Sequence, residues 1–165
     1  MQIREATIVD TRAISELIRP LAEEYIAHEF SPEGAANLLA SIEPGAIEGY
    51  MTSGFKYHVV EENGAVIGVV GVRDNSHLYH LFVADDFRGQ GLARELWDVA
   101  RDGCREAGHL GDFTVNSSRF AVEMYRKFGF VETGPPETKN GVTSVPMKLT
   151  AAGGTGVSPV QAEQS

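Results

Sequence analysis

An arginine and two glycines stand where a hydrophobic stretch gives way to a helical pattern. Residues 78–83 suit a buried strand, helical spacing of apolar residues begins at Leu92, and Arg88-Gly89-Gln90-Gly91 lies between them. The first backbone N–H groups of a helix have no intrahelical partner and lie at the positive end of the helix dipole. Glycines let a phosphate approach that backbone closely, and an arginine adds a guanidinium. The loop therefore predicts a pyrophosphate-binding site.

Two familiar nucleotide-binding loops do not fit this spacing. The stretch has no match to the Walker A pattern G-x-x-x-x-G-K-[ST], and a dinucleotide-binding fingerprint needs a third glycine where Arg94 stands. Residues Arg88–Ala93 do satisfy [QR]-x-x-G-x-[GA] at every constrained position, directly after a hydrophobic strand. The remaining alternative is that the two glycines only form a tight turn between strand and helix.

A second pattern follows later in the chain. Residues Asn116–Phe130 read N-x-x-x-x-A-x-x-x-Y-x-x-x-G-F. Ala121 and Tyr125 are one helical turn apart, so the small residue leaves room beside the tyrosine ring. The two patterns, in this order and at this separation, resemble the motifs of the Gcn5-related N-acetyltransferases, the GNAT family. The resemblance covers about residues 3–149.

The resemblance implies where a cofactor would bind. In this family the fourth and fifth strands separate, and acetyl-CoA lies between them with its pantetheine arm along the fourth strand. Pantetheine carries two amides that need partners in a desolvated groove, and a splayed strand offers free N–H and C=O groups. The residues expected to bind acetyl-CoA are Leu81, Phe82 and Val83 for the pantetheine, Arg88, Gly89, Gln90, Gly91, Leu92 and Ala93 for the pyrophosphate, Asn116 beside the pantetheine and Tyr125 at the thioester sulfur.

Acetyl transfer to an amine requires a neutral amine, a stabilised oxyanion and a proton for the departing thiolate. Direct attack in a ternary complex needs no covalent intermediate on the enzyme. We expect the Tyr125 hydroxyl to supply the proton to the thiolate. We expect a backbone N–H near Leu81 or Phe82 to stabilise the oxyanion.

The general base is the open part of this mechanism. Many relatives carry a glutamate or a histidine on the fourth strand, facing the acetyl group, and residues 77–83 contain no glutamate. Strict alternation divides this strand into two faces. One face would carry His77, Tyr79 and Leu81, and the other Leu78, His80 and Phe82. We predict His77 as the base, acting directly or through a water held by Tyr79. His80 takes this role if a bulge changes the register, and water alone is the remaining alternative.

Metal and thiol chemistry find little support. The single cysteine, Cys104, excludes an internal disulfide and a multi-cysteine zinc site. It falls in a helical pattern, so we predict a packed, unreactive thiol. His77 and His80, three residues apart on a regular strand, would point to opposite faces and could not share one ion. We therefore expect no metal cofactor.

The elements that would position these residues alternate between strands and helices. The patterns predict strands at residues 2–9, 55–62, 65–72, 77–83, 112–116, 130–133 and 142–149, and helices at residues 11–27, 32–43, 92–107 and 119–128 with a short one ending near Ser53. Asp10 and Ser31 are the expected helix caps, and Asn63-Gly64 is a strong hairpin signal.

This order predicts an α/β protein with the GNAT fold. We expect a mixed, mostly antiparallel sheet of about seven strands, with splayed central strands and helices on both faces. Residues 1–149 would form one acetyltransferase domain. Residues 150–165 are rich in Gly, Ala and Ser with almost nothing to bury, and they predict a disordered tail.

Composition restricts the partners. The formal net charge of −9 argues against a general nucleic-acid or anionic membrane surface. No apolar run is long enough to span a bilayer and no signal-peptide pattern is present, so a cytoplasmic protein is expected. The expected partner is a small-molecule or peptide amine.

The identity of that amine stays open. A metabolite amine, an antibiotic, a peptide N-terminus and a lysine side chain all remain candidates. Tyr25, Phe30, Tyr50 and the loop at residues 135–141 are expected on the acceptor side. Homodimerisation through the last strands is common in the family and is undecided here. A non-catalytic acyl-CoA-binding regulatory module on the same fold is the alternative function, although the presence of Tyr125 favours an enzyme.

Overall fold

Eight strands and five α-helices make up the part of the chain that the computed structural model describes, residues 1–151. The strands are β1 (Gln2–Glu5), β2 (Lys56–Glu62), β3 (Ala65–Arg73), β4 (His77–Val83), β5 (Phe113–Ser117), β6 (Val131–Glu132), β7 (Glu137–Lys139) and β8 (Val142–Leu149). The helices are α1 (Thr11–Tyr25), α2 (Pro32–Ala40), α3 (Pro44–Thr52), α4 (Leu92–Glu106) and α5 (Val122–Lys127). Most of the predicted tail, 150–165, lies outside the described residues.

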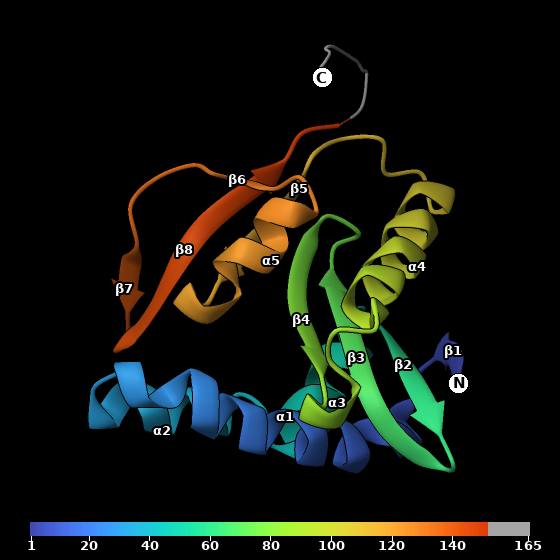
Figure 1. The fold of residues 1–165 in the computed structure, drawn as a ribbon, viewed down its shortest axis with the longest axis horizontal. Helices are drawn as coiled ribbons and strands as arrows, with labels where there is room; N and C mark the ends of the chain where they lie inside the picture. Colours follow the sequence, from blue (N-terminus) through green and yellow to red (C-terminus); the bar gives the residue numbers. More distant parts are fainter. Residues whose placement is uncertain (152–165) are drawn as a thin grey trace.

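The sheet has the order β1-β2-β3-β4-β5-β8-β6, and β7 pairs with β8 off this path. Among the strand pairs of residues 1–151, β4–β5 is parallel and the others are antiparallel. Only His77–Thr114 and Leu78–Val115 pair between β4 and β5, and beyond them the two strands separate (Figure 1). The predicted mixed sheet with splayed central strands is confirmed.

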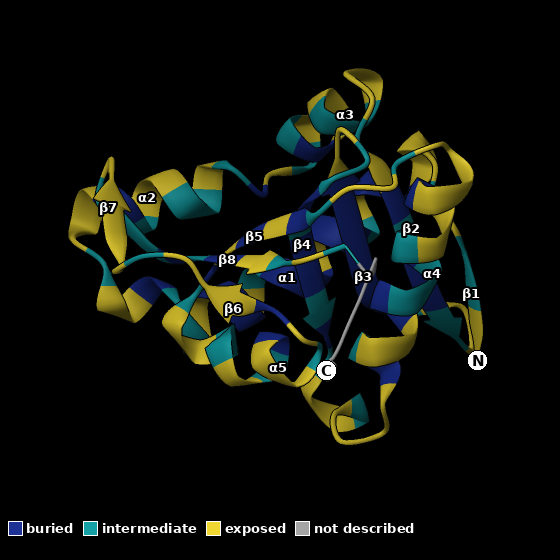
Figure 2. Cartoon of the chain, turned by 90° about the horizontal axis from the view of Figure 1, so that it is seen from above, coloured by how far each residue is buried: buried dark blue, intermediate teal, exposed yellow. Residues whose placement is uncertain are grey.

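Helices cover both faces of the sheet, as predicted. On one face α4 and α5 enclose a core that includes Leu96, Trp97 and Phe113. On the other face α1 and α3 enclose a second core, with Ile14 and Ile47 among its fully buried members. Figure 2 shows the buried residues concentrated in the central strands, with exposed residues on the outer sides of the helices and in the loops.

Two Asn-Gly turns have the backbone that a tight hairpin requires. Asn63 and Gly64 both have positive φ angles, 54° and 80°, and join β2 to β3 as predicted. Asn140 and Gly141 repeat this geometry at 54° and 79° between β7 and β8. We did not predict β7, so the sheet has eight strands rather than about seven, although the same dipeptide signal was present.

The first strand is shorter than predicted. It ends at Glu5 rather than Val9, and a 3-10 turn, Ile8–Asp10, precedes α1. The Asp10 side chain does not cap α1. Instead it accepts a hydrogen bond from the Thr7 N–H at 2.8 Å and pairs with the Arg4 guanidinium.

A β-bulge in β4 overturns the predicted alternation of side chains. Gly71 of β3 pairs with His80, but Val72 pairs with Leu78, so Tyr79 is an extra residue. Leu78 and Leu81 consequently share the core under α4. Tyr79 and His80 both contact the Tyr50 ring on the opposite face.

Candidate functional site

The loop before α4 presents an uncapped helix start. Gly89 and Gly91 have φ angles of 77° and 80°, which glycine adopts without strain, and a Cβ at either position would meet no atom within 4 Å. Gly91 is the N-cap residue of the 15-residue α4, and it supplies no side-chain cap. The first backbone N–H groups of α4 therefore have no side-chain cap, and unpaired N–H groups at a helix start suit an anionic group.

Arg88 lies among aromatic side chains from two other segments. Its guanidinium carbon is 4.5 Å from the Tyr25 ring centroid and 5.2 Å from that of Phe120. Asp85 lies 3.3 Å from Arg88 Nε, and the Tyr25 hydroxyl donates to Asp85 at 3.0 Å. We call Tyr25, Asp85, Arg88 and Phe120 the Arg88 cluster. It joins the end of α1 to the segments that follow β4 and β5.

Phe120 and Asp85 were not singled out from the sequence. Phe120 occupies a position of the second motif where any residue is allowed, and Asp85 lies three residues before the first motif. Tyr25, which was expected on the acceptor side, contacts Arg88 of the predicted pyrophosphate loop.

Asn116 lies on β5, and Tyr125 lies on α5, the helix that follows this strand. Tyr125 on α5 is 5% exposed and packs against Phe128 and Phe130. Burial raises its pKa above the usual value, so the phenol stays protonated at neutral pH. Its hydroxyl forms no hydrogen bond with the described residues, which leaves the proton available. Asn116 is exposed on β5, one residue beyond the last pair with β4.

The bulge on β4 gathers polar aromatic groups where the strands separate. The Tyr79 hydroxyl donates to the Tyr50 hydroxyl at 3.2 Å, and Tyr50 donates to the Ser41 carbonyl at 2.8 Å. His80 has its Nδ1 atom 2.9 Å from the Tyr57 hydroxyl. Burial lowers the pKa of His80 to about 3, so the ring is neutral.

His77 lies at the paired end of β4 rather than at the splay. Its Nδ1 atom is 2.8 Å from the Thr114 hydroxyl on β5, and its side chain is mostly buried. Burial, followed by the positive charge of Arg73, lowers the pKa of His77. The structure thus brings Tyr79 and His80 together at the separation, with His77 at the start of the same strand.

Helix α2 packs against the turn between β7 and β8. The Asn37 side chain donates to the Asn140 carbonyl at 2.9 Å. A Cβ added at Gly34 would lie 2.0 Å from the Gly141 carbonyl oxygen, so only glycine permits this approach. Segments more than a hundred residues apart therefore form a single surface near the predicted acceptor side.

Cys104 is buried as predicted, and burial raises the pKa of its thiol. Within residues 1–151 there is no group of three or more His, Cys, Asp or Glu side chains placed to hold a metal ion. None of the helices in that part of the chain has the length and apolar character needed to cross a membrane.

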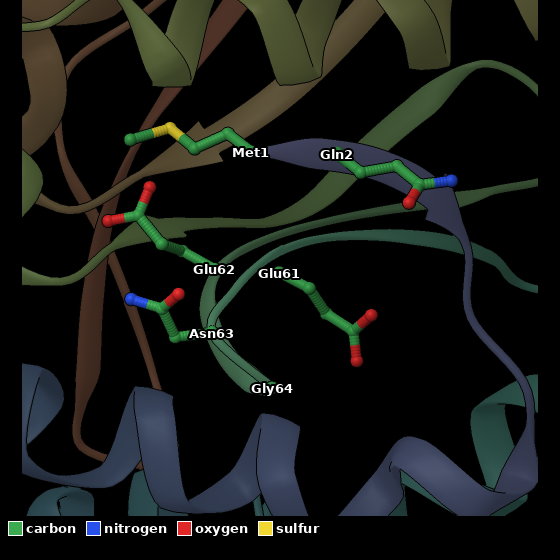
Figure 3. A pocket seen from close by; sticks show the side chains of 6 residues that line it. All are labelled: Met1, Gln2, Glu61, Glu62, Asn63 and Gly64. Carbon is green, nitrogen blue, oxygen red and sulfur yellow. The ribbon is translucent and has the colours of Figure 1, made fainter.

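A separate pocket of about 670 Å³ lies at the edge of the sheet around β1 and the β2–β3 turn. Figure 3 shows the carboxylates of Glu61 and Glu62 beside the amides of Gln2 and Asn63. With the carboxylate of Glu62 and that of Glu61, which is paired with Arg4, this pocket suits the pyrophosphate of CoA less well than the glycine loop does. It lies apart from the glycine loop and the splay.

Comparison with known proteins places the chain among acetyltransferases. The family model described as the acetyltransferase (GNAT) domain matches residues 26–151, more than half of the chain. An acetyltransferase from Agrobacterium fabrum is 32% identical over 76 residues, covering 45% of this chain and 56% of that protein.

Solved structures share the fold. A GCN5-related N-acetyltransferase from Rhodopseudomonas palustris superposes with a TM-score of 0.76 at 20% identity, over 90% of this chain and 94% of that one. The PaiA N-acetyltransferase from Thermoplasma acidophilum, in complex with coenzyme A, gives a TM-score of 0.74 at 14% identity. The match covers 90% of this chain and 98% of that one. The chain spans about half the length of the first curated relatives that it matches.

Proposed function

The chain belongs to the GNAT acetyltransferase family, and from that premise we propose that it transfers the acetyl group of acetyl-CoA to a primary amine. The amine attacks the thioester directly in a ternary complex. The observation that carries this proposal is the separation of β4 from β5 beyond Leu78 and Val115, with the uncapped start of α4 after the β4 arm. A long, narrow cofactor with amides and a pyrophosphate matches that combination.

The cofactor would lie along β4. Backbone groups of Leu81, Phe82 and Val83 would pair with the pantetheine amides, because β5 no longer occupies that edge. The pyrophosphate would bind the N–H groups at Gly89–Ala93, with Arg88 beside it. Asn116, exposed on β5, would contact the pantetheine or its neighbourhood.

In the chemical step, the amine nitrogen bonds to the thioester carbonyl carbon and the C–S bond breaks. The thiolate takes the proton of the Tyr125 hydroxyl, which the raised pKa keeps protonated until then. A backbone N–H near Leu81 or Phe82 would stabilise the oxyanion. His77, neutral because burial lowers its pKa, is proposed to take the amine proton through a water held by Tyr79. Cys104 is buried with a raised pKa, which argues against a covalent acetyl-enzyme.

The test is a calorimetric titration of the protein with acetyl-CoA, followed by thiol release against a panel of amines. The panel should contain a polyamine, an aminoglycoside, a peptide with a free N-terminus and a lysine-containing peptide with a blocked N-terminus. Binding with amine-dependent thiol release supports the enzyme and begins to identify its acceptor. Binding without release from any amine favours a regulatory acyl-CoA-binding module. No binding would contradict the proposed cofactor site.

A further inference from the structure

Three residues in register on adjacent strands connect the middle of the sheet to the splay. Tyr57 of β2 pairs with Gly71 of β3, and Gly71 pairs with His80 of β4. A Cβ added at Gly71 would lie 2.4 Å from the Tyr57 ring, so the ring lies directly over this glycine. The tyrosine therefore crosses β3 and brings its hydroxyl to within 2.9 Å of His80 Nδ1.

The direction of this hydrogen bond follows from the surroundings of Tyr57. The side chain is 2% exposed, and among the described residues its hydroxyl has no partner other than His80. A buried hydroxyl that donates to nothing costs roughly 1–3 kcal/mol. Burial also raises the pKa of Tyr57, so the phenol keeps its proton. The hydroxyl must therefore donate, and His80 Nδ1 must accept.

This fixes the tautomer of His80. A neutral imidazole whose Nδ1 accepts a hydrogen bond carries its hydrogen on Nε2. The ring is neutral, since the groups packed around it are the aromatic rings of Tyr50, Tyr57, Tyr79 and Phe82 rather than charges. His80 Nε2 has no hydrogen-bond partner among residues 1–151, and it is not among their fully enclosed unpaired atoms. Its N–H therefore remains available to a ligand.

We propose that His80 donates a hydrogen bond from Nε2 to the carbonyl oxygen of the bound thioester, and that Tyr57 is the positioning residue that holds His80 in this tautomer. The donor role rests on the proposed acetyl transfer. His80 comes two residues after Leu78, the last β4 residue that pairs with β5, and so lies where the two strands have separated. No proton leaves the ring. The hydrogen bond from Nε2 becomes stronger as the carbonyl oxygen gains negative charge and becomes an oxyanion.

The proposal also excludes His80 as the general base. A nitrogen that already carries hydrogen cannot accept the amine proton, and Nδ1 is occupied by Tyr57. The bulge therefore changes the direction of the His80 side chain, as the sequence prediction allowed, but His80 would act as a hydrogen-bond donor and not as the base.

The tautomer can be measured without any substrate. Long-range proton–nitrogen correlation spectra of the ¹⁵N-histidine-labelled protein distinguish the two neutral forms, and the His80→Gln variant assigns the signal by its loss. We expect the Nε2–H form in the wild type. Tyr57→Phe should remove this preference and give a mixture or the Nδ1–H form. A wild-type spectrum of the Nδ1–H form would overturn the proposal whether or not the protein is an enzyme.

The donor role is tested by kinetics with acetyl-CoA and the acceptor found above. A glutamine amide nitrogen can take the place of Nε2, so His80→Gln should keep at least about a third of kcat. His80→Met has no donor and should lose at least about tenfold, because removing an oxyanion donor costs on the order of 100-fold in known enzymes. Tyr57→Phe should lower kcat several-fold and leave KM for acetyl-CoA within about twofold.

His58→Gln is the matched control, because His58 follows Tyr57 on β2 and its side chain therefore points to the opposite face of the sheet. It should leave kcat unchanged. An active wild type with equal kcat in the Gln and Met variants would overturn the donor role alone. A wild type that binds no acetyl-CoA would overturn the proposed function, and the donor role with it.

Discussion

The guanidinium of Arg88 can interact with neighbouring side chains of the protein or with a bound pyrophosphate. In the structure described here it stacks on Tyr25 and Phe120 and pairs with Asp85. A pyrophosphate at the start of α4 would add a stronger anionic partner. The aromatic rings orient the guanidinium near that site, which reduces the ordering needed on binding.

Arg88→Glu should weaken acetyl-CoA binding by at least about tenfold, because a carboxylate would then face the pyrophosphate. Calorimetric titration measures this directly. Arg105→Glu makes the same charge change in the last turn of α4 and serves as the control, with an affinity close to that of the wild type. Equal affinities for all three proteins would contradict the pyrophosphate site.

Tyr125→Phe should lower kcat on the order of 100-fold, the usual contribution of a positioned acid, while the dissociation constant for acetyl-CoA changes less than about twofold. The phenylalanine ring keeps the contacts with Phe128 and Phe130, so the fold is preserved. Steady-state kinetics and calorimetry on the same preparation separate the two effects. A parallel loss of turnover and affinity would assign Tyr125 to binding rather than proton transfer.

At this scale the sequence predicted the motif residues but not their neighbours. Gly89, Gly91 and Tyr125 were predicted from short-range spacing, and the structure gives each a suitable local geometry. Tyr25 and Phe120 contact Arg88 from segments about 60 and 30 residues away in the sequence. No local sequence pattern predicts such a long-range contact. Gly71, which interrupts a run of valines, is the signal in the sequence of a close approach to the backbone.

Strand β4 shows how one extra residue changes which side chains meet. Period-two alternation is a property of a regular strand, and the bulge at Tyr79 interrupts it. The bulge depends on the register between β3 and β4, which is set by packing on both faces. The helices and most strand boundaries could be predicted because caps, glycines and apolar spacing are local signals. The bulge could not.

Gly71→Ala should lower the free energy of unfolding by about 1–3 kcal/mol, because the new methyl group overlaps the Tyr57 ring. Urea denaturation followed by circular dichroism gives the value. Gly49→Ala in α3 is the matched control, since a Cβ there meets no atom within 4 Å, and it should gain roughly 0.5–1 kcal/mol from helix propensity. A neutral Gly71→Ala would mean that the Tyr57 ring does not depend on this glycine.

At the scale of the whole molecule, one charged group ties the N-terminus to the sheet. Arg4 of β1 binds Asp10 at 2.8 Å, before α1, and Glu61 of β2 at 3.0 Å. The hydrogen bonds from Arg4 lower the pKa of Asp10 below its ordinary value of 3.8. A carboxylate with a lowered folded-state pKa stabilises the fold fully above the unfolded-state pKa, and the contribution is lost as the pH falls through the folded-state pKa.

Arg4→Met should therefore reduce the free energy of unfolding by about 1 kcal/mol at pH 7, an order of magnitude typical of a partly exposed pair. The difference from the wild type should shrink as the pH falls below about 4. Chemical denaturation at several pH values measures it. Arg19→Met, which removes an exposed pair with Glu43, should have a smaller effect. A difference that stays constant down to pH 2 would contradict the role of Asp10.

The junction of β4 and β5 divides the sheet into two antiparallel halves that share two residue pairs. A cofactor along β4 would supply backbone pairing that the protein itself lacks there. At a ligand concentration of 100 times the dissociation constant, binding adds about 2.7 kcal/mol to the free energy of unfolding. Amide hydrogen exchange at Thr114 and Val115 should slow when acetyl-CoA is added, and unchanged exchange would contradict binding at this junction.

The same junction would link the resistance of the protein to proteolysis to the concentration of acetyl-CoA in the cell. With two pairs joining the halves, a cell poor in acetyl-CoA would hold this protein in its least stable form, more open to proteases. A cell rich in acetyl-CoA would hold it in a more stable, ligand-bound form. If acetyl-CoA binds at this junction as proposed, the abundance of the protein would follow the supply of acetyl-CoA.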